Sequence, residues 1–91
     1  MFPKTLDNAN VLFYTPKDNF GCIYYDNGDI ADYVYFLAIC KYQNDDVYYL
    51  FSCNENQEVV GDSIWNSIEE CMKIASSSYD GNLLWINIDM Q

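Results

Sequence analysis

The side chains in this sequence that could do chemistry are mainly carboxylates and thiols. Fourteen aspartates and glutamates stand against four lysines, arginine and histidine do not occur, and the formal net charge is −10. Without histidine the chain has no Ser-His or Cys-His catalytic pair and no imidazole ligand for zinc. Without arginine it has no bidentate clamp for a phosphate group, and its glycines form no phosphate-binding loop. Several common enzyme classes are therefore excluded, and acidity is the main chemical feature that remains.

The carboxylates could in principle act as a catalytic pair or as calcium ligands. A glycosidase-type pair needs a cleft that separates the pKa values of two carboxyl groups, and a small sheet with surface turns offers little cleft. The D-x-D-x-D-G alternation of an EF-hand calcium loop does not occur. We therefore expect no catalytic residue, no metal site and no cofactor. Such a surface attracts basic partners and repels nucleic acid and anionic membranes, although acidity can also serve only solubility.

The cysteines indicate the compartment rather than a site. Cys22, Cys40, Cys53 and Cys71 fall within predicted strands and a helix, which is typical of buried, reduced thiols in the cytosol. Their spacings do not fit a four-thiolate zinc site. Residues 1–10 lack the apolar core of a signal peptide, and the longest apolar run, residues 33–40, is too short to cross a bilayer. We expect a cytoplasmic protein that does not bind membranes.

Residues 32–53 organise the predicted fold. Two aromatic and β-branched runs flank the polar residues 43–46, which is typical of an antiparallel hairpin. Asn27-Gly28 predicts a type I′ turn before the longer of these strands. Ser67 and Glu70 have the spacing of a capping box, which predicts a helix over residues 67–77 that stops at Asp80-Gly81. The predicted strands are residues 10–15, 20–25, 30–42, 47–53, 58–62 (ended by Gly61) and 82–88.

The order βββββαβ predicts one α+β domain over residues 1–91, an antiparallel β-meander of about six strands with one helix packed on one face. Pairing of Tyr42 with Val47 would divide the central side chains between two faces. We expect the helix to cover the face with small residues. The opposite face would be closed by sheet curvature and the N-terminal segment, or would bind a partner. The first face carries Val34, Phe36, Ala38, Cys40, Tyr49, Phe51 and Cys53, and the opposite face carries Tyr33, Tyr35, Leu37, Ile39, Lys41, Tyr48, Leu50 and Ser52.

The meander gathers one group of carboxylates at a single end of the sheet. The turns at residues 26–29 and 54–57 and the end of the helix meet there, whereas Lys17 and Lys41 are expected at the opposite end. Nearby tyrosines could anchor a partner, because tyrosine is frequent among the residues that dominate binding energy. Alternatively, the charged turns are simply solvated. The predicted partner-binding residues are Asp26, Asp29, Asp32, Glu55, Glu58, Tyr24, Tyr33 and Tyr35, with Asp80 at the same end.

The segment VVGDSIWNSIEECMKIA, followed by NLLWINI, resembles small bacterial immunity proteins encoded beside polymorphic or contact-dependent growth inhibition toxins. The resemblance covers residues 47–88 and consists of a strand, a polar turn, a strand, a Ser-Ile-Glu-Glu helix start and a strand with tryptophan. It implies a cytosolic, non-catalytic inhibitor that binds one cognate toxin domain. The family shares no common binding residues, so the resemblance assigns none here.

The charge is consistent with that implication, because a nuclease toxin must be basic to hold nucleic acid, and an acidic protein can occupy its basic groove. We expect a monomer that binds no nucleic acid directly. Two other functions stay open. One is a phage-encoded inhibitor that mimics nucleic acid against a defence complex, which gene neighbours would reveal. The other is a homo-oligomerisation module in which the opposite face of the sheet, which carries the tyrosines, pairs with the same face of a second copy. Sizing by light scattering would reveal such a dimer.

Overall fold

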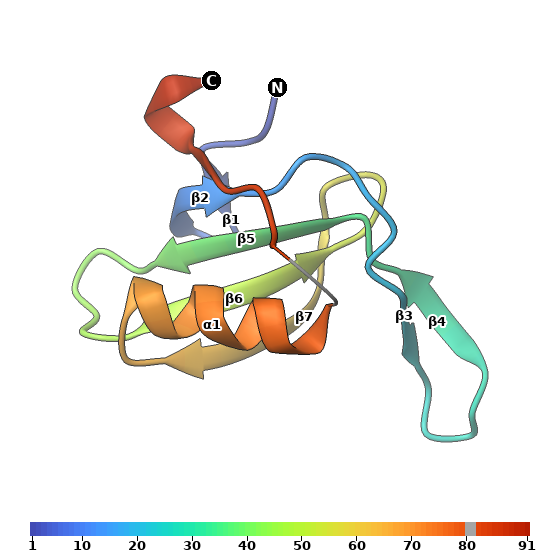
Figure 1. The fold of residues 1–91 in the computed structure, drawn as a ribbon. Coiled ribbons are helices and arrows are strands. Elements are labelled where there is room, and N and C mark those ends of the chain that lie inside the picture. The colour runs from blue at the N-terminus through green and yellow to red at the C-terminus, as the bar shows by residue number, and fades with distance from the viewer. Residues whose placement is uncertain (80–81) are drawn as a thin grey trace.

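The computed structural model of the protein describes residues 1–79 and 82–91, and it confirms the α+β fold with an antiparallel meander and one helix (Figure 1). The main sheet has the order β1-β2-β5-β6-β7, and β8 pairs with β2 beside β1. A second sheet contains only β3 and β4. The elements are β1 (Thr5–Leu6), β2 (Ala9–Tyr14), β3 (Cys22–Tyr24), β4 (Ile30–Tyr33), β5 (Phe36–Lys41), β6 (Tyr48–Cys53), β7 (Val59–Trp65), α1 (Ile68–Ser78), β8 (Ile86–Asn87) and the 3-10 turn η1 (Ile88–Met90).

The hairpin of β5 and β6 forms the centre of the main sheet, as predicted. Cys40 lies opposite Tyr49 and Phe36 lies opposite Cys53, which is the register that continues to the expected pairing of Tyr42 with Val47. The side chains of β5 are fully buried over much of its length. A strand that is covered on both faces contains a nearly continuous apolar run, as this one does.

The single strand predicted over residues 30–42 is wrong, because the chain changes partner at Val34 and Tyr35. The amide of Val34 donates to the carbonyl of Gly21, whereas the amide of Tyr35 donates to the carbonyl of Cys53. The residues before this point therefore pair with β3, and those after it pair with β6. As a result β2 lies directly beside β5, and β3 and β4 project from the main sheet as a separate hairpin (Figure 1).

The helix covers the face of the sheet opposite to the one we expected. Cys71 and Ala75 of α1 pack with Leu37, Ile39 and Leu50, on the face predicted to be closed by the N-terminal segment. Val34 packs on this helix side too, because the change of partner interrupts the alternation of side chains.

The face with small residues is covered by both ends of the chain. Phe2 and Leu6 from the N-terminal segment and Ile88 from η1 pack against Ala38, Cys40, Phe51 and Cys53. Both faces of the central strands are therefore buried within the domain, and neither is free for a partner.

The N-terminal residues, which carried no clear pattern, form a strand and a tight turn. Asp7 and Asn8 join β1 to β2, and both have positive φ angles (48° and 69°), which is the geometry of a type I′ turn. The Gln91 side chain then ties the two ends together. Its Oε1 accepts from the Phe2 amide at 2.9 Å, and its Nε2 donates to the Phe2 carbonyl at 2.9 Å.

The helix begins where predicted, but its capping differs in one contact. The Glu70 amide donates to the Ser67 hydroxyl at 3.0 Å, whereas the Glu70 carboxylate accepts from the Asn66 amide at 3.3 Å rather than from Ser67. Gly61 does not end a strand, since β7 continues to Trp65. The last strand is shorter than predicted and pairs with β2. The expected stop at residues 80–81 lies outside the described residues.

Candidate functional site

The projecting hairpin, meaning β3, β4 and the turn between them, ends in a turn that the sequence predicted only in part. The Gly28 amide donates to the Tyr25 carbonyl at 2.9 Å, and the Tyr25 amide donates to the Asp29 carbonyl at 2.8 Å. Only Gly28 has a positive φ (93°) in this turn, so the type I′ prediction is wrong. The loop of Asp26, Asn27 and Gly28 instead ends with glycine in the left-handed region, the usual form of a slightly longer hairpin loop.

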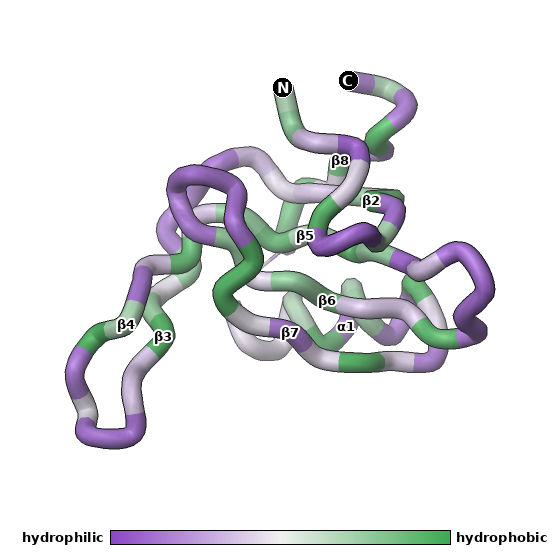
Figure 2. The backbone as a smooth tube through the Cα atoms, turned by 180° about the vertical axis from the view of Figure 1, so that it is seen from behind, coloured by the Kyte–Doolittle hydropathy of each residue, from purple (hydrophilic) through white to green (hydrophobic). Residues whose placement is uncertain are grey.

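Asn27 holds the carboxylate of Asp29 at this turn. Its side-chain oxygen accepts from the Asp29 amide at 3.0 Å, and its side-chain nitrogen donates to Asp29 Oδ2 at 3.2 Å. Asp26 is exposed on the same turn. The end of the hairpin is thus hydrophilic and carries two carboxylates (Figure 2).

The outer face of the projecting hairpin exposes large apolar side chains. On this face Tyr24 is 62% exposed, Tyr33 is 50% exposed and Ile30 is 46% exposed. Tyr25, next to the turn, is also 62% exposed. Tyr24 lies opposite Ile30, and Cys22 lies opposite Tyr33. The register shifts between these two pairs, so Ile30 and Tyr33, although three residues apart, can both lie on the face of Cys22 and Tyr24. The side chain of Cys22 beside Tyr24 raises the pKa of the Tyr24 hydroxyl above its ordinary value.

The inner face attaches the projecting hairpin to the domain through Ile23. This side chain joins the core cluster on the helix side of the sheet, and its Cδ1 would lie 3.5 Å from a Cβ placed on Gly61. A two-stranded hairpin is only marginally stable by itself, so this contact and the pairing of Val34 with Phe20 and Gly21 hold it in place.

Asn54 brings two of the predicted carboxylates together at the base of the projecting hairpin. Its Nδ2 donates to Asp32 Oδ2 at 2.9 Å and to Glu58 Oε1 at 3.0 Å. Its Oδ1 accepts from the amides of Asn56 and Glu58, each at 3.0 Å, and its side chain is only 8% exposed. The sequence identified Asn54 only as a turn residue, because nothing local shows that a distant strand carries Asp32 to it.

Glu55 is not free of lysine, in contrast to the prediction. Lys17 Nζ lies 2.9 Å from Glu55 Oε1 and 5.2 Å from the centre of the Tyr35 ring. Lys17 reaches this end because the chain beside it pairs with the base of the projecting hairpin, where the Asp18 amide donates to the Tyr35 carbonyl at 3.0 Å. Both charged side chains of the ion pair are exposed, so it contributes little stability, on the order of 0–1 kcal/mol.

The structure therefore divides the predicted site residues into two groups. The projecting hairpin carries Tyr24, Asp26, Asp29, Asp32 and Tyr33, and the loop between β6 and β7 with its surroundings carries Glu55, Glu58 and Tyr35. Asp32 connects the groups through Asn54. Asp80, expected at the same end, lies outside the described residues.

The thiols form no comparable group. Cys40, Cys53 and Cys71 are buried and Cys22 is half-buried, and all four are free. Burial raises the pKa of Cys53 to about 12 and that of Cys71 to about 11, and it raises the pKa of Cys40 even further. These three thiols are packing groups and not nucleophiles. Over residues 1–79 and 82–91, no three potential ligands are arranged to hold a metal ion.

Two findings concern the chain as a whole. No helix in the described part of the chain is long and apolar enough to span a membrane. Comparison of the chain with family models, with curated proteins and with solved structures finds no match.

Proposed function

We propose that this protein is a non-catalytic inhibitor of the immunity-protein class, which neutralises a cognate toxin by binding a basic domain of it with the projecting hairpin. One observation carries the proposal. The projecting hairpin, whose outer face no other described element of the chain covers, exposes Tyr24, Tyr25, Ile30 and Tyr33 close to the carboxylates of Asp26 and Asp29.

The composition of this surface supports a protein partner. Aromatic side chains are enriched in protein interfaces and supply much of their binding energy, whereas an isolated solvated turn does not need them. None of the four lysines belongs to residues 22–33, so the projecting hairpin has one sign of charge. The overall charge of −10 adds a long-range attraction that raises the association rate with a basic domain.

The same charge argues against self-association through the projecting hairpin. Two copies paired along this surface would bring Asp26 and Asp29 of each chain together, and like charges at close range are destabilising. A basic toxin domain would instead place positive charges opposite these carboxylates. A nuclease is an example, because its active site must hold nucleic acid.

The test is a pull-down and calorimetric titration with the product of the gene immediately upstream, which the proposal expects to be the toxin. We expect a one-to-one complex that weakens between 0.1 and 1 M salt, because the screening length falls from about 10 Å to about 3 Å over that range. The variant Asp26→Lys/Asp29→Lys should bind about 10- to 100-fold more weakly.

A matched variant controls for the change in net charge. Asp46→Lys/Glu69→Lys adds the same charge at the opposite end of the main sheet, where both carboxylates are exposed. It should bind nearly as well as the unmodified protein. Equal losses in the two variants would contradict the assignment to the projecting hairpin, and a salt-insensitive dimer without a partner would contradict the proposed function.

A further inference from the structure

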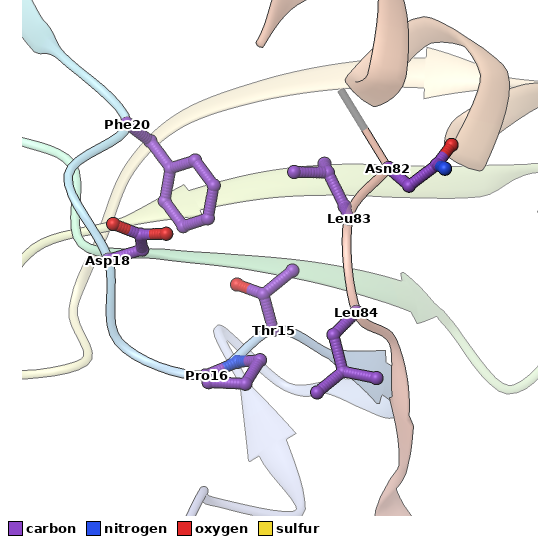
Figure 3. Close-up of a pocket in the computed structure, with 7 residues that line it drawn as sticks. All are labelled: Thr15, Pro16, Asp18, Phe20, Asn82, Leu83 and Leu84. Atoms are coloured by element: carbon purple, nitrogen blue, oxygen red, sulfur yellow. The ribbon is translucent and has the colours of Figure 1, made fainter. Parts of the chain in front are cut away.

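A small pocket lies between the segment that leads from β2 to β3 and the segment that leads to β8 (Figure 3). Its volume is about 190 Å³. Pockets for drug-sized ligands span roughly 300–1,000 Å³, so this one has room for a single side chain and not for a larger molecule.

Apolar side chains form part of the lining of the pocket, which they share with Thr15, Asp18 and Asn82. The apolar residues are Pro16, Phe20, Leu83 and Leu84, and the ring of Phe20 makes an edge contact with the ring of Tyr79 at a centroid distance of 5.3 Å. Leu84 is mostly exposed, so the pocket opens directly to solvent. An aliphatic chain would remove these groups from water.

The polar groups of the pocket favour a cation. The carboxylate of Asp18 points towards the space that the apolar side chains surround (Figure 3). The hydroxyl of Thr15 is buried and accepts from the Leu37 amide at 2.9 Å, so Asp18 is the group that a cation would meet. Within the described part of the chain Asp18 forms no ion pair, because the adjacent Lys17 reaches Glu55 instead. The Asp18 carboxylate would repel a negatively charged ligand, and a neutral ligand would gain no charge attraction from it.

We infer that this pocket takes a lysine or arginine side chain from the protein partner, with the aliphatic part against Phe20 and Leu83 and the cationic end at Asp18. The source of the side chain rests on the proposed function, which supplies a basic protein. The position fits that partner, because the Phe20 amide pairs with the Val34 carbonyl at 2.9 Å, at the base of the projecting hairpin. One surface of the partner could therefore contact the pocket and the projecting hairpin together.

The test needs no toxin. The ¹⁵N-labelled protein is titrated with N-acetyl-lysine methylamide and N-acetyl-arginine methylamide, and with N-acetyl-norleucine methylamide as the neutral probe of similar shape. We expect the cationic probes to shift the amide signals of Thr15, Phe20 and Leu84, with dissociation constants on the order of 1–10 mM. The norleucine probe should bind several-fold more weakly.

Two matched variants identify the charge that matters. Asp18→Asn keeps an oxygen for the hydrogen bond from the Asn19 amide and should weaken the cationic probes about two- to fivefold. Asp45→Asn makes the same change where Asp45 accepts from the Asp46 amide, and it should leave binding unchanged.

Equal binding of the neutral and cationic probes, or equal effects of the two variants, would overturn the inference. Cationic probes that bind as expected while no basic partner is captured would retain the pocket and contradict the proposed function. If a toxin is captured and Asp18→Asn leaves its affinity unchanged, the proposed function is retained and the inference about the pocket is contradicted.

Discussion

Replacement of Asn54 by aspartate tests the arrangement that joins the projecting hairpin to the main sheet. The Asn54 side chain donates to the carboxylates of both Asp32 and Glu58, at 2.9 and 3.0 Å. Asn54→Asp changes the shape very little, but it removes both donated hydrogen bonds and puts a third carboxylate between the other two. The variant should therefore be strongly destabilised at neutral pH.

The size of the loss has an upper limit that depends on pH. If repulsion becomes large, one carboxyl group takes up a proton, which costs about 4 kcal/mol at pH 7 for a group with an ordinary pKa of about 3.9. The lost hydrogen bonds add about 1–2 kcal/mol. At pH 4 the protonation costs less than about 1 kcal/mol, so mainly the hydrogen-bond contribution is left.

The sign follows from proton uptake. The crowded carboxyl group binds its proton more tightly in the folded variant than in the unfolded chain, so the free energy of unfolding falls as the pH rises above about 4. We expect the penalty relative to the unmodified protein to be about 3–6 kcal/mol at pH 7 and about 1–2 kcal/mol at pH 4.

Urea unfolding at both pH values, followed by tryptophan fluorescence, measures these differences. Asn54→Ala is the control, because it removes the same hydrogen bonds without adding a charge, and its penalty should change much less with pH. An Asn54→Asp penalty of equal size at pH 4 and pH 7 would show that the Asn54 side chain does not lie between two carboxylates.

Three further outcomes are expected. Gly28→Ala should lower the free energy of unfolding by about 1 kcal/mol, because Gly28 has a φ of 93°. Gly61→Ala, whose added methyl would lie at an ordinary 3.5 Å from Ile23, should leave this free energy unchanged or raise it by up to about 1 kcal/mol. Urea midpoints distinguish the two variants, and equal losses would contradict the backbone geometry. Iodoacetamide at pH 8 should modify Cys22 first, as mass spectrometry would show, and early modification of any of the three buried thiols would contradict their burial and raised pKa values. Gln91→Ala should lower the free energy of unfolding by about 1–2 kcal/mol, because both hydrogen bonds to the Phe2 backbone are lost, and an unchanged urea midpoint would contradict this contact.

The elements that the sequence predicted correctly depend on neighbouring residues. The turn at residues 43–46 sets the pairing of β5 with β6, and Ser67 caps the helix because its hydroxyl meets an amide within the same turn. The tight turn at Asp7 and Asn8 was not predicted. Both residue types tolerate positive φ, but the surrounding residues showed no strand pattern.

The features that the sequence did not reveal depend on distant partners. The composition of residues 30–42 is that of one strand. It is divided because the Val34 amide donates to the carbonyl of Gly21, whereas the next amide, that of Tyr35, donates to the carbonyl of Cys53. The side of the sheet that the helix covers is another example, because both faces of β5 and β6 are apolar and the choice depends on where the two chain ends pack. The contact of Asn54 with Asp32 and the approach of Lys17 to Glu55 follow from that same rearrangement.

The contact between Gln91 and Phe2 also affects how this domain can be attached to other molecules. The two chain ends lie beside each other, on the side of the main sheet away from the projecting hairpin (Figure 1). A tag or carrier fused at either end would leave the tyrosines and carboxylates of the hairpin accessible. Closely spaced ends also allow a domain to be inserted into a surface loop of another protein with little strain. The domain could thus be grafted as a unit, with its projecting hairpin pointing away from the host.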